Sequence, residues 1–362
     1  MDEAGVGYIY IGVPARERSL RIRKGSFEET LDIDELRDIW YRPSYQLDTK
    51  QSMNGCADAR YKNYKQQPLV WKIKPASLSL PCREQRGGSP RAAIIREKGT
   101  NGEREMAYSL YLAGFDVKDV MMTDLISGRE TLDEVQMIVF CGGFSNSDVL
   151  GSAKGWAGAF LYNPKAKAAL DRFYARPDTL SLGICNGCQL MVELGLLELA
   201  PLSSPEGDTD VKSSNSKTIE APSGAVRGAT MLHNTSHKFE SAFLGVTIPE
   251  NNSVMLGSLA GSKLGIWVAH GEGKFHLPQP ESAYHVVAKY SYDEYPGNPN
   301  GSDYSVAGLC SADGRHLAMM PHLERAIFPW QCAFYPSNRS RDELTPWIEA
   351  FVNARKWCEE HA

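Results

Sequence analysis

The sequence predicts an α/β protein whose mostly parallel, doubly wound sheet carries helices on both faces, preceded by a small α+β N-terminal segment. From residue 92 onward, short apolar runs alternate with amphipathic helical patterns, as in a parallel sheet covered on both faces. The pair Gly142-Gly143 and the residue Cys185 each stand at the end of such a run. Ligands of these sheets bind beyond the carboxyl ends of the strands, so a site is expected there.

The chain divides into unlike parts. Residues 1–74 contain many aromatic residues but few strand patterns, as expected for the edge of a larger fold. Residues 75–91 are rich in Pro, Ser and Gly and are predicted to be a linker. Residues 92–362 hold the alternating pattern and are predicted to form the main domain.

Each element follows from a local pattern. In the first part, strands are predicted over 7–13 and 19–25. A helix is predicted from about Asp34, and Ile33, Leu36 and Trp40 lie on one face of it. In the main domain, strands are predicted over 91–97, 117–123, 135–144 and 179–185. The helices between and after them are predicted over 101–114 with Gly114 as its cap, 157–176 with a break at Pro164, and 186–197.

The remaining elements are less regular. The polar stretch 201–229 is predicted to be a surface loop, and strands are expected within 231–248 and 263–275. Residues 304–322 are predicted to form a hairpin that turns at Asp313-Gly314. A final helix is predicted within 342–361, and its buried face comprises Trp347, Ala350, Phe351, Ala354 and Trp357.

Composition excludes several classes of protein. Of the 362 residues, 42% are hydrophobic and 23% charged, which is ordinary for a globular protein and unlike a disordered one. The net charge of −5 argues against non-specific binding to nucleic acid or to an anionic membrane. The chain contains no apolar run long enough to span a membrane, and its first residues are acidic where a signal peptide is basic. We therefore expect a cytoplasmic protein.

Cys185 and Cys188 are the only two of the eight cysteines with suggestive spacing. A zinc site would need a second CxxC or a His pair at suitable spacing, and the sequence offers neither, so no metal is expected. A redox pair at a helix N-terminus remains an alternative. Gly183 and Gly187 favour a third interpretation, a nucleophile elbow, because neighbours of the strained residue must be small. The start of the following helix would also favour a thiolate.

A nucleophilic cysteine requires a base, and His322 is the best candidate among the eight histidines. It follows an apolar strand, and Glu324 stands two residues later, where an extended chain points in the same direction. The carboxylate could then orient the imidazole while the imidazole activates the sulfur. Alone, a His-x-Glu sequence is more typical of a solvated loop; combined with the elbow, it predicts a catalytic pair.

The third component is Gly142-Gly143. A glycine pair directly after a buried strand can present main-chain N–H groups to a developing oxyanion, together with the N–H of Asn186. The alternative is a tight turn that simply needs positive φ.

These motifs, in this order, resemble the class I (triad) glutamine amidotransferases. The resemblance rests on "GGFSNSDVLGSAKGWAGAFLYN", "GICNGCQLM", "HNTSHKFE", "VAHGEGKF" and "DGRHLAMMPHLER". It implies that Cys185 is the nucleophile, His322 the base and acid, and Glu324 the orienting carboxylate. It further implies an oxyanion and glutamine-binding set comprising Gly142, Gly143, Phe144, Asn186, Gln189, His270, Gly271 and Glu272. Leu323 departs from the family's frequent proline, and its side chain is expected to point away from the site.

More narrowly, residues from about 91 onward resemble the C-terminal glutaminase domain of the large, single-chain phosphoribosylformylglycinamidine synthases, a family of purine biosynthesis. Residues 1–74 resemble the tail of their ATP-using half. No phosphate-cradling GxxxxGK[ST] loop is present in the sequence, so ATP and Mg²⁺ are expected only in the absent synthetase half and no cofactor in this chain. The implied partners are L-glutamine and the synthetase domains of the same enzyme. Two alternatives stay open, namely a docking fragment that is inactive alone and a Cys-His amidase or peptidase.

Overall fold

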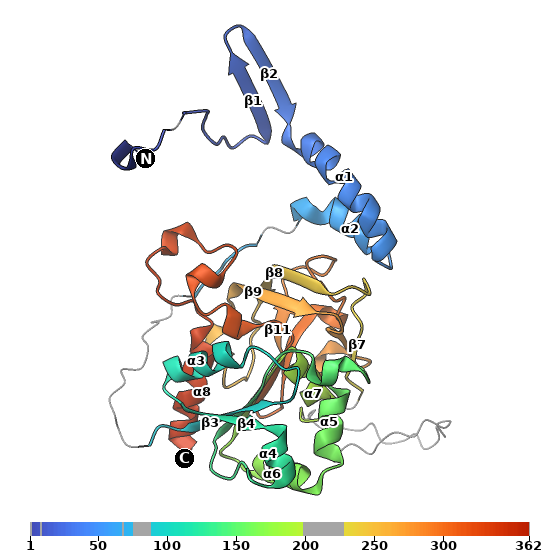
Figure 1. Cartoon of the computed structure of the whole chain (residues 1–362), viewed down its shortest axis with the longest axis vertical. Helices are drawn as coiled ribbons and strands as arrows, with labels where there is room; N and C mark the ends of the chain where they lie inside the picture. Colours follow the sequence, from blue (N-terminus) through green and yellow to red (C-terminus); the bar gives the residue numbers. More distant parts are fainter. Residues whose placement is uncertain (1, 8, 67–68, 75–87, 198–227, 362) are drawn as a thin grey trace.

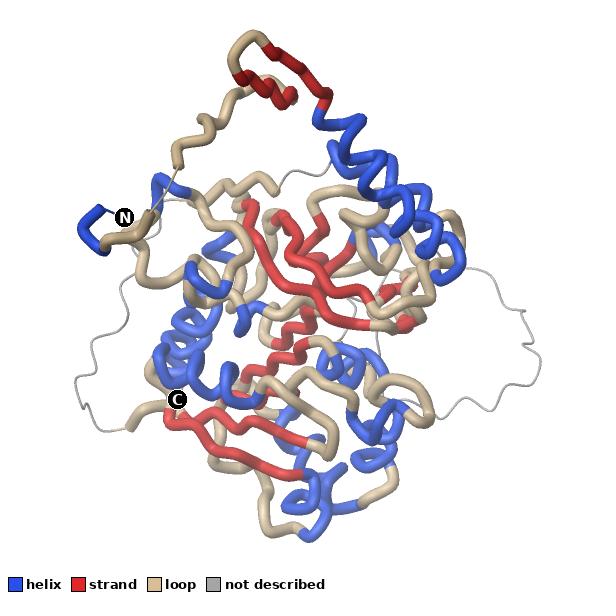
Figure 2. The backbone as a smooth tube through the Cα atoms, turned by 45° about the horizontal axis from the view of Figure 1, so that its top comes forward, coloured by secondary structure: helices blue, strands red, loops and turns tan. Residues whose placement is uncertain are grey.

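The computed structural model describes residues 2–7, 9–66, 69–74, 88–197 and 228–361. Its main domain is built on one nine-stranded sheet. The strands are β3 (Arg91–Arg96), β4 (Asp116–Met121), β5 (Met137–Phe140), β6 (Leu180–Ile184), β8 (Glu240–Thr247), β9 (Lys263–His270), β11 (Val286–Tyr290), β12 (Val306–Cys310) and β13 (His316–Met319). Figure 2 shows these strands as a band through the middle of the domain with helices outside it.

The sheet has the order β4-β3-β5-β6-β13-β12-β11-β8-β9. Strands β4, β3, β5, β6 and β13 pair in parallel, and the ladders from β13 to β9 are antiparallel. Only β12 and β8 therefore run against the other strands, which confirms the predicted mostly parallel sheet. The β6–β13 ladder pairs Ile184 with Met319, so the segments following these residues begin side by side.

Helices cover both faces of the sheet. They are α3 (Glu103–Ala113), α4 (Met122–Ser127), α5 (Lys154–Leu161), α6 (Pro164–Ala175), α7 (Asn186–Glu193) and α8 (Ile348–His361). The step from β3 to β4 and the step from β5 to β6 run in opposite directions along the sheet. Because such crossovers are right-handed, α3 lies on one face and α5 and α6 on the other. Helix α8 packs on α3, and α7 packs on α5, which gives two helical layers (Figure 1).

Local sequence explains where these helices begin and end. Gly114 ends α3 in a left-handed conformation, with φ of 102°. The predicted break at Pro164 is present, because α6 begins there and the Asn163 side chain accepts the next two free N–H groups. The predicted hairpin is also present: β12 and β13 are antiparallel, and Gly314 has φ of 76° at the turn. The predicted strand over 117–123 is two residues too long, since Met122 already opens α4.

The N-terminal part forms a small α+β unit that projects from the main domain (Figure 1). It contains the hairpin β1 (Ser19–Lys24) and β2 (Phe27–Asp32), followed by α1 (Ile33–Gln51) and α2 (Cys56–Lys62). Asp32 caps α1 by accepting from the N–H groups of Asp34 and Glu35. The strand predicted over 7–13 is wrong for the described residues of that stretch, which are exposed and pair with no strand. Apolar β-formers alone do not make a strand without a partner.

Helices α1 and α2 nevertheless contact the main domain. The Met53 N–H donates to the Ser236 carbonyl at 3.0 Å, and Asn63 donates to the Tyr295 carbonyl at 2.9 Å. Further along the chain, the main chains of Lys72 and Lys263 donate a hydrogen bond to each other at the free edge of β9. Two short strands, β7 (Thr230–Leu232) and β10 (Lys274–His276), form a separate antiparallel ladder.

Some predictions fall on residues that the structure does not describe. The loop over 201–229 lies outside the described residues except for its last two, and the linker over 75–91 except for its last four. No described helix has both the length and the apolar composition needed to cross a membrane.

Candidate active site

Cys185 stands at the bend between β6 and α7. Its φ of 53° and ψ of −106° are strained for a residue with a side chain, and such strain is typical of a nucleophile elbow. The Cys185 N–H donates to the Met319 carbonyl at 2.9 Å, so β13 helps to hold the bend. The thiol lies 3.5 Å from the Ala269 carbonyl at the end of β9.

The two glycines predicted to flank the elbow are required by close backbone contacts. A Cβ on Gly183 would lie 2.5 Å from the Gly187 carbonyl oxygen, and a Cβ on Gly187 would lie 2.0 Å from the Phe140 oxygen. Neither distance leaves room for a methyl group. The glycines thus let α7 start directly against β5 and β6, and this approach sets the position of Cys185.

His322 and Glu324 follow β13, the parallel neighbour of β6. Both side chains are 2% exposed, and His322 Nδ1 lies 2.7 Å from Glu324 Oε1. The Nε2 atom of His322 is buried and has no hydrogen-bond partner among the described residues. The His322 N–H donates to the Trp267 carbonyl of β9 at 2.8 Å, which fixes the backbone of the loop. Leu323 is fully buried.

The imidazole and the thiol meet across Gly142. A Cβ placed on Gly142 would lie 2.8 Å from His322 Cε1 and 3.4 Å from Cys185 Cβ. Only a glycine therefore fits between the two side chains. The structure brings together the three residues that the sequence predicted as nucleophile, base and orienting carboxylate.

Electrostatics favour the charged imidazole. Burial alone would lower the pKa of His322, but the Glu324 carboxylate and then the Cys185 side chain outweigh it and raise that pKa to about 9. His270, also buried and close to His322, shows the opposite behaviour: burial and then the charge of His322 lower its pKa to about 4. The site thus holds one imidazole that is protonated at neutral pH and one that is neutral.

The loop Gly142-Gly143-Phe144 supplies main-chain donors. Gly143 forms a bridge with Thr100 in which Asn101 donates to Gly142 and Phe144 donates to Gly99. In such a pair the central residues do not bond each other, so the Gly143 N–H points away from residues 99–101. The Phe144 N–H is already used, and Phe144 contributes its ring to the site instead. The N–H of Asn186 opens α7, where first-turn donors have no partner within the helix.

Hydrogen-bonded amide side chains connect α7 to two loops of the site. The Ser145 N–H donates to Asn186 Oδ1 at 3.1 Å, and Asn186 Nδ2 donates to Gln189 Oε1 at 3.0 Å. Gln189 Nε2 in turn donates to the Glu272 carbonyl at 2.7 Å. Asn186 and Gln189 therefore hold the glycine-pair loop, α7 and the loop after β9 in fixed relation.

A cavity of about 70 Å³ opens beside the thiol. Its lining includes Gly143, Phe144, Cys185, Gln189, His270, Gly271 and Glu272 from the predicted set. It also includes Asp148, Ser152, Phe239 and Ala269, whose roles the sequence interpretation missed. Asp148 and Phe239 lie within the motifs quoted above, and this position was the indication in the sequence that they belong to the site. Gly142 and Asn186 stand behind this lining and support it.

Two carboxyl groups give the cavity an acidic side. The Ser152 N–H donates to Glu272 at 3.3 Å, while the Ser152 hydroxyl donates to Asp148 at 3.3 Å. Burial and the nearby charge of Glu272 raise the pKa of Asp148, and one oxygen of Asp148 has no partner among the described residues. The pair is therefore suited to bind a cationic group.

The second cysteine of the CxxC sequence has a different environment. Cys188 is fully buried in α7, burial raises the pKa of its thiol, and both thiols are free. Within the described parts of the chain, no three His, Cys, Asp or Glu side chains are arranged to hold a metal ion.

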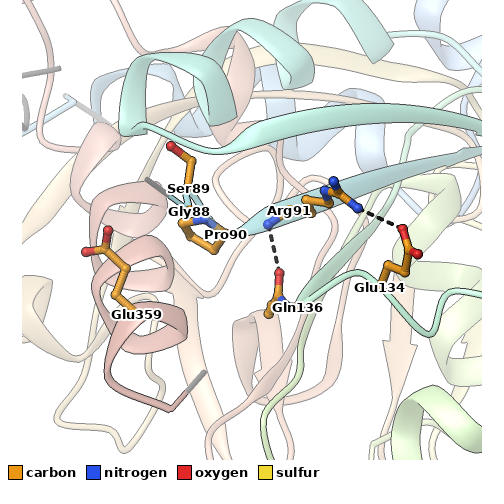
Figure 3. Close-up of a pocket in the computed structure, with 7 residues that line it drawn as sticks. All are labelled: Gly88, Ser89, Pro90, Arg91, Glu134, Gln136 and Glu359. Carbon is orange, nitrogen blue, oxygen red and sulfur yellow. Dashed lines mark hydrogen bonds and ion pairs between the residues drawn. The ribbon is translucent and has the colours of Figure 1, made fainter. Parts of the chain in front are cut away.

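A larger cavity of about 490 Å³ lies at the other end of the parallel strands, beside the start of β3 (Figure 3). Arg91 starts β3 there and bonds Gln136 and Glu134. This cavity faces the amino ends of the parallel strands, whereas Cys185 stands at a carboxyl end, where ligands of such sheets bind.

The chain is similar to known proteins. A phosphoribosylformylglycinamidine synthase from Homo sapiens is 41% identical over 343 residues, which cover 91% of this chain and 25% of that protein. A probable chloroplastic/mitochondrial one from Arabidopsis thaliana is 40% identical and covers 90% of this chain and 23% of that protein. The chain thus spans about a quarter of the length of these curated relatives.

Among solved structures, PurLQS from Thermotoga maritima matches with a TM-score of 0.51 and 23% identity, over 75% of this chain and 99% of that one. At this identity the match shows a shared fold. The family described as the CobB/CobQ-like glutamine amidotransferase domain matches residues 89–358. Since this match covers most of the sequence, the chain belongs to the CobB/CobQ-like glutamine amidotransferase domain family.

Proposed function

We propose that the chain hydrolyses L-glutamine through a γ-glutamyl thioester on Cys185. The observation that carries the proposal is the meeting of three pieces of chain: a thiol on a strained bend, a buried imidazole bonded to Glu324, and the Gly143 and Asn186 amides beside them. This is the geometry that acyl transfer by a cysteine requires.

In the first half of the reaction, His322 already holds the proton that the Cys185 thiol has given up, and the resulting thiolate attacks the side-chain carbonyl carbon of glutamine. The negative charge on oxygen is stabilised by the amides of Gly143 and Asn186; one such donor is typically worth about 3 to 4 kcal/mol. The imidazolium then gives its proton to the departing nitrogen, the C–N bond breaks, and ammonia leaves a thioester. Glu324 keeps Nδ1 protonated and Nε2 directed at the sulfur.

In the second half, water attacks the thioester with His322 as base, and the sulfur departs as glutamate is released. Asp148 and Glu272 are suited to bind the α-ammonium group of glutamine, because both line the cavity that contains Cys185. The neutral His270 and the backbone of Gly271 complete the same wall.

The ammonia is proposed to serve a synthetase half that converts formylglycinamide ribonucleotide into the amidine in purine biosynthesis. The relatives named phosphoribosylformylglycinamidine synthase, about four times longer than this chain, support this assignment. In the proposal, ATP and Mg²⁺ act in the synthetase half and not in this chain. A cytoplasmic location stays a prediction.

The direct test replaces Cys185 by Ser. We expect glutaminase activity to fall by at least roughly 10³-fold and a glutamine-like chloroketone to stop labelling the protein, because both reactions use this thiolate. Cys332→Ser is the matched control, since Cys332 is a partly exposed thiol outside the site. Undiminished hydrolysis by the Cys185→Ser protein would refute the assignment.

One observation favours a second candidate, a docking fragment that needs its synthetase to become active. The cavity of about 70 Å³ is much smaller than the roughly 300 to 1,000 Å³ of ordinary ligand pockets. Glutaminase activity measured with and without the synthetase half separates the two candidates, and substantial activity of the chain alone removes the second. Faster cleavage of peptides than of glutamine would instead support the amidase or peptidase alternative.

A further inference from the structure

Four charged side chains connect the N-terminal helices to the loop that precedes β8 and to the first residue of that strand. Asp48 of α1 accepts from Lys238 Nζ at 2.7 Å and from Arg60 Nη1 at 2.7 Å. Arg60 of α2 also donates through Nη2 to Glu240 at 3.0 Å. The order along the network, Lys238, Asp48, Arg60, Glu240, alternates in sign, so each neighbouring pair attracts.

The network is largely buried. The side chains of Asp48 and Glu240 are each 9% exposed, and those of Arg60 and Lys238 are 24% and 27% exposed. Ion pairs in such surroundings are screened less by water than pairs on an open surface, and removing one partner leaves a buried charge. Glu240 is held further by the hydroxyl groups of Ser236 and Tyr295. The network is therefore suited to fix a backbone position.

The turn between α1 and α2 also binds the backbone of this loop. The Met53 N–H donates to the Ser236 carbonyl at 3.0 Å, and Asn54 Nδ2 donates to the Thr235 carbonyl at 2.8 Å. Between these contacts and the ion pairs lies His237, with φ of 52°. A non-glycine residue keeps such a conformation only where its surroundings impose it.

Phe239 lies between Lys238 and Glu240 in the sequence, and its side chain lines the cavity that contains Cys185. Lys238 and Glu240 bond to α1 and α2, whereas the side chain of Phe239 between them has another environment. The ring centroid of Phe239 lies 5.9 Å from that of Phe144, which lines the same cavity. Phe239 is half exposed, which places it between the cavity and solvent.

The loop also supports the opposite wall of the cavity. Asn234 Nδ2 donates to the carbonyls of Lys238 and His270, and Asn234 Oδ1 accepts from the Gly273 N–H. A shift of residues 234–240 would therefore move Phe239 and the His270–Gly273 segment together.

We propose that Asp48 and Arg60 are positioning residues of the glutaminase site: by holding Lys238 and Glu240, they hold Phe239 over the mouth of the Cys185 cavity. The inference deepens the proposed function and rests on it for the substrate, but not for the geometry. The α1–α2 unit is then part of the apparatus that shapes the pocket, although it contacts no reacting atom.

The test uses Arg60→Met in the full chain, which removes both of its ion pairs. Two readouts are taken: the KM and kcat for glutamine, and the rate at which iodoacetamide alkylates Cys185, followed on the Cys185 peptide by mass spectrometry. Coupling of this kind changes such quantities by between roughly 2-fold and 30-fold. We expect alkylation to accelerate and KM to rise by factors in that range, with a smaller change in kcat.

Arg18→Met is the matched control, because it removes an exposed ion pair with Asp34 in the same N-terminal unit. It should alter neither readout by more than about twofold. Arg60→Lys, which keeps the charge, should retain part of the wild-type behaviour. If Arg60→Met fails to fold, Lys238→Met replaces it, since it removes one outer pair and leaves Glu240 bonded to Arg60.

A double-mutant cycle with Phe239→Ala separates positioning from general destabilisation. If Arg60 acts through Phe239, Arg60→Met should change alkylation little once the ring is absent; effects that multiply independently would overturn the proposal. Unchanged KM and alkylation in a folded Arg60→Met protein would also overturn it. Should the wild-type chain hydrolyse no glutamine while the alkylation rates respond as expected, the proposed function fails and the positioning role stands.

Discussion

The two nitrogen atoms of His322 have different partners. Nδ1 is bonded to Glu324 at 2.7 Å, whereas Nε2 is buried on the side of Cys185 without a partner among the described residues. A buried polar atom without a hydrogen-bond partner costs folding free energy, and such atoms are often found where they serve a reaction. In the proposed reaction, the hydrogen bond to Glu324 leaves Nε2 as the atom that exchanges protons with sulfur and substrate.

Glu324→Gln keeps the shape of the side chain and removes its charge. Because the amide can present its NH₂ group to Nδ1, the imidazole loses both its fixed tautomer and its counter-charge. We expect kcat for glutamine to fall by roughly 10²- to 10⁴-fold with little change in fold. Glu134→Gln, at the other end of the parallel strands, is the control; equal activity of the two variants would contradict the role of Glu324.

The pH dependence of the reaction follows from the raised pKa of His322. In the proposed reaction, the imidazolium that protonates the departing nitrogen is populated at neutral pH and is lost as the pH rises through about 9. A kcat profile for glutamine should therefore decline near pH 9. Removing the Glu324 charge lowers the pKa, so the same decline should move to lower pH in Glu324→Gln. A decline that stays in place would show that another group controls it.

The sequence predicted those residues of the candidate site that lie in sharp local patterns. Cys185 follows a buried strand between two glycines, and His322 and Glu324 follow another strand two residues apart. An extended chain was expected at this point, but Glu324 lies in a short 3-10 helix, Leu323–Arg325, and still reaches His322. Phe239 and Asp148 were missed because their place in the cavity depends on how distant loops fold. Phe144 was expected as part of the oxyanion and glutamine-binding set, and only the bridge to residues 99–101 reveals that its N–H is already used.

Among the elements, the contact between α7 and the sheet allows the least room for an added side chain. The start of α7 approaches β5 so closely that Gly187 is in contact with the Phe140 carbonyl. This contact relates the packing of one helix directly to the position of Cys185.

Gly187→Ala should destabilise the protein by about 1 to 3 kcal/mol, because its methyl group would overlap backbone that cannot move aside. Gly158→Ala is the matched control within α5, where the new Cβ would meet only Tyr162 at 3.7 Å. It should stabilise by about 0.5 to 1 kcal/mol, as alanine favours helix over glycine. The free energies of unfolding in urea would measure both, and a neutral Gly187→Ala would contradict the packing argument.

The order of elements was largely predictable because the apolar runs of the main domain are short and alternate with helical patterns. Strands β3, β5 and β6 are buried along nearly their whole length, and each was predicted to within a few residues. The stretch 7–13 shows the limit of this reasoning. Its apolar residues have the composition of a strand, but strand formation is decided by a partner, and among the described residues they have none.

For the whole molecule, the main domain and the N-terminal hairpin differ in how much they bury. Strands β5 and β6 lie within the sheet and are fully buried, while β1 and β2 pair only with each other and expose Leu20, Ile22 and Phe27. A lone two-stranded hairpin is marginally stable in water.

Amide hydrogen exchange should reveal this difference. We expect amides of β5 and β6 to exchange at least about 1,000-fold more slowly than those of β1 and β2, because the former open only with the whole domain. Similar protection in both regions would mean that the hairpin is stabilised by contacts beyond those described. Amides of α1 near Asp48 should fall between the two extremes, as that end of the helix is anchored.

The neighbouring positions of β6 and β13 also govern when the sulfur becomes reactive during synthesis of the chain. Cys185 leaves the ribosome long before His322, and the two meet only after β13 has emerged and aligned with β6. Until then the growing polypeptide carries an ordinary thiol with no proton acceptor beside it. In the proposed reaction, the sulfur therefore gains its proton acceptor only when the domain that encloses it is nearly complete.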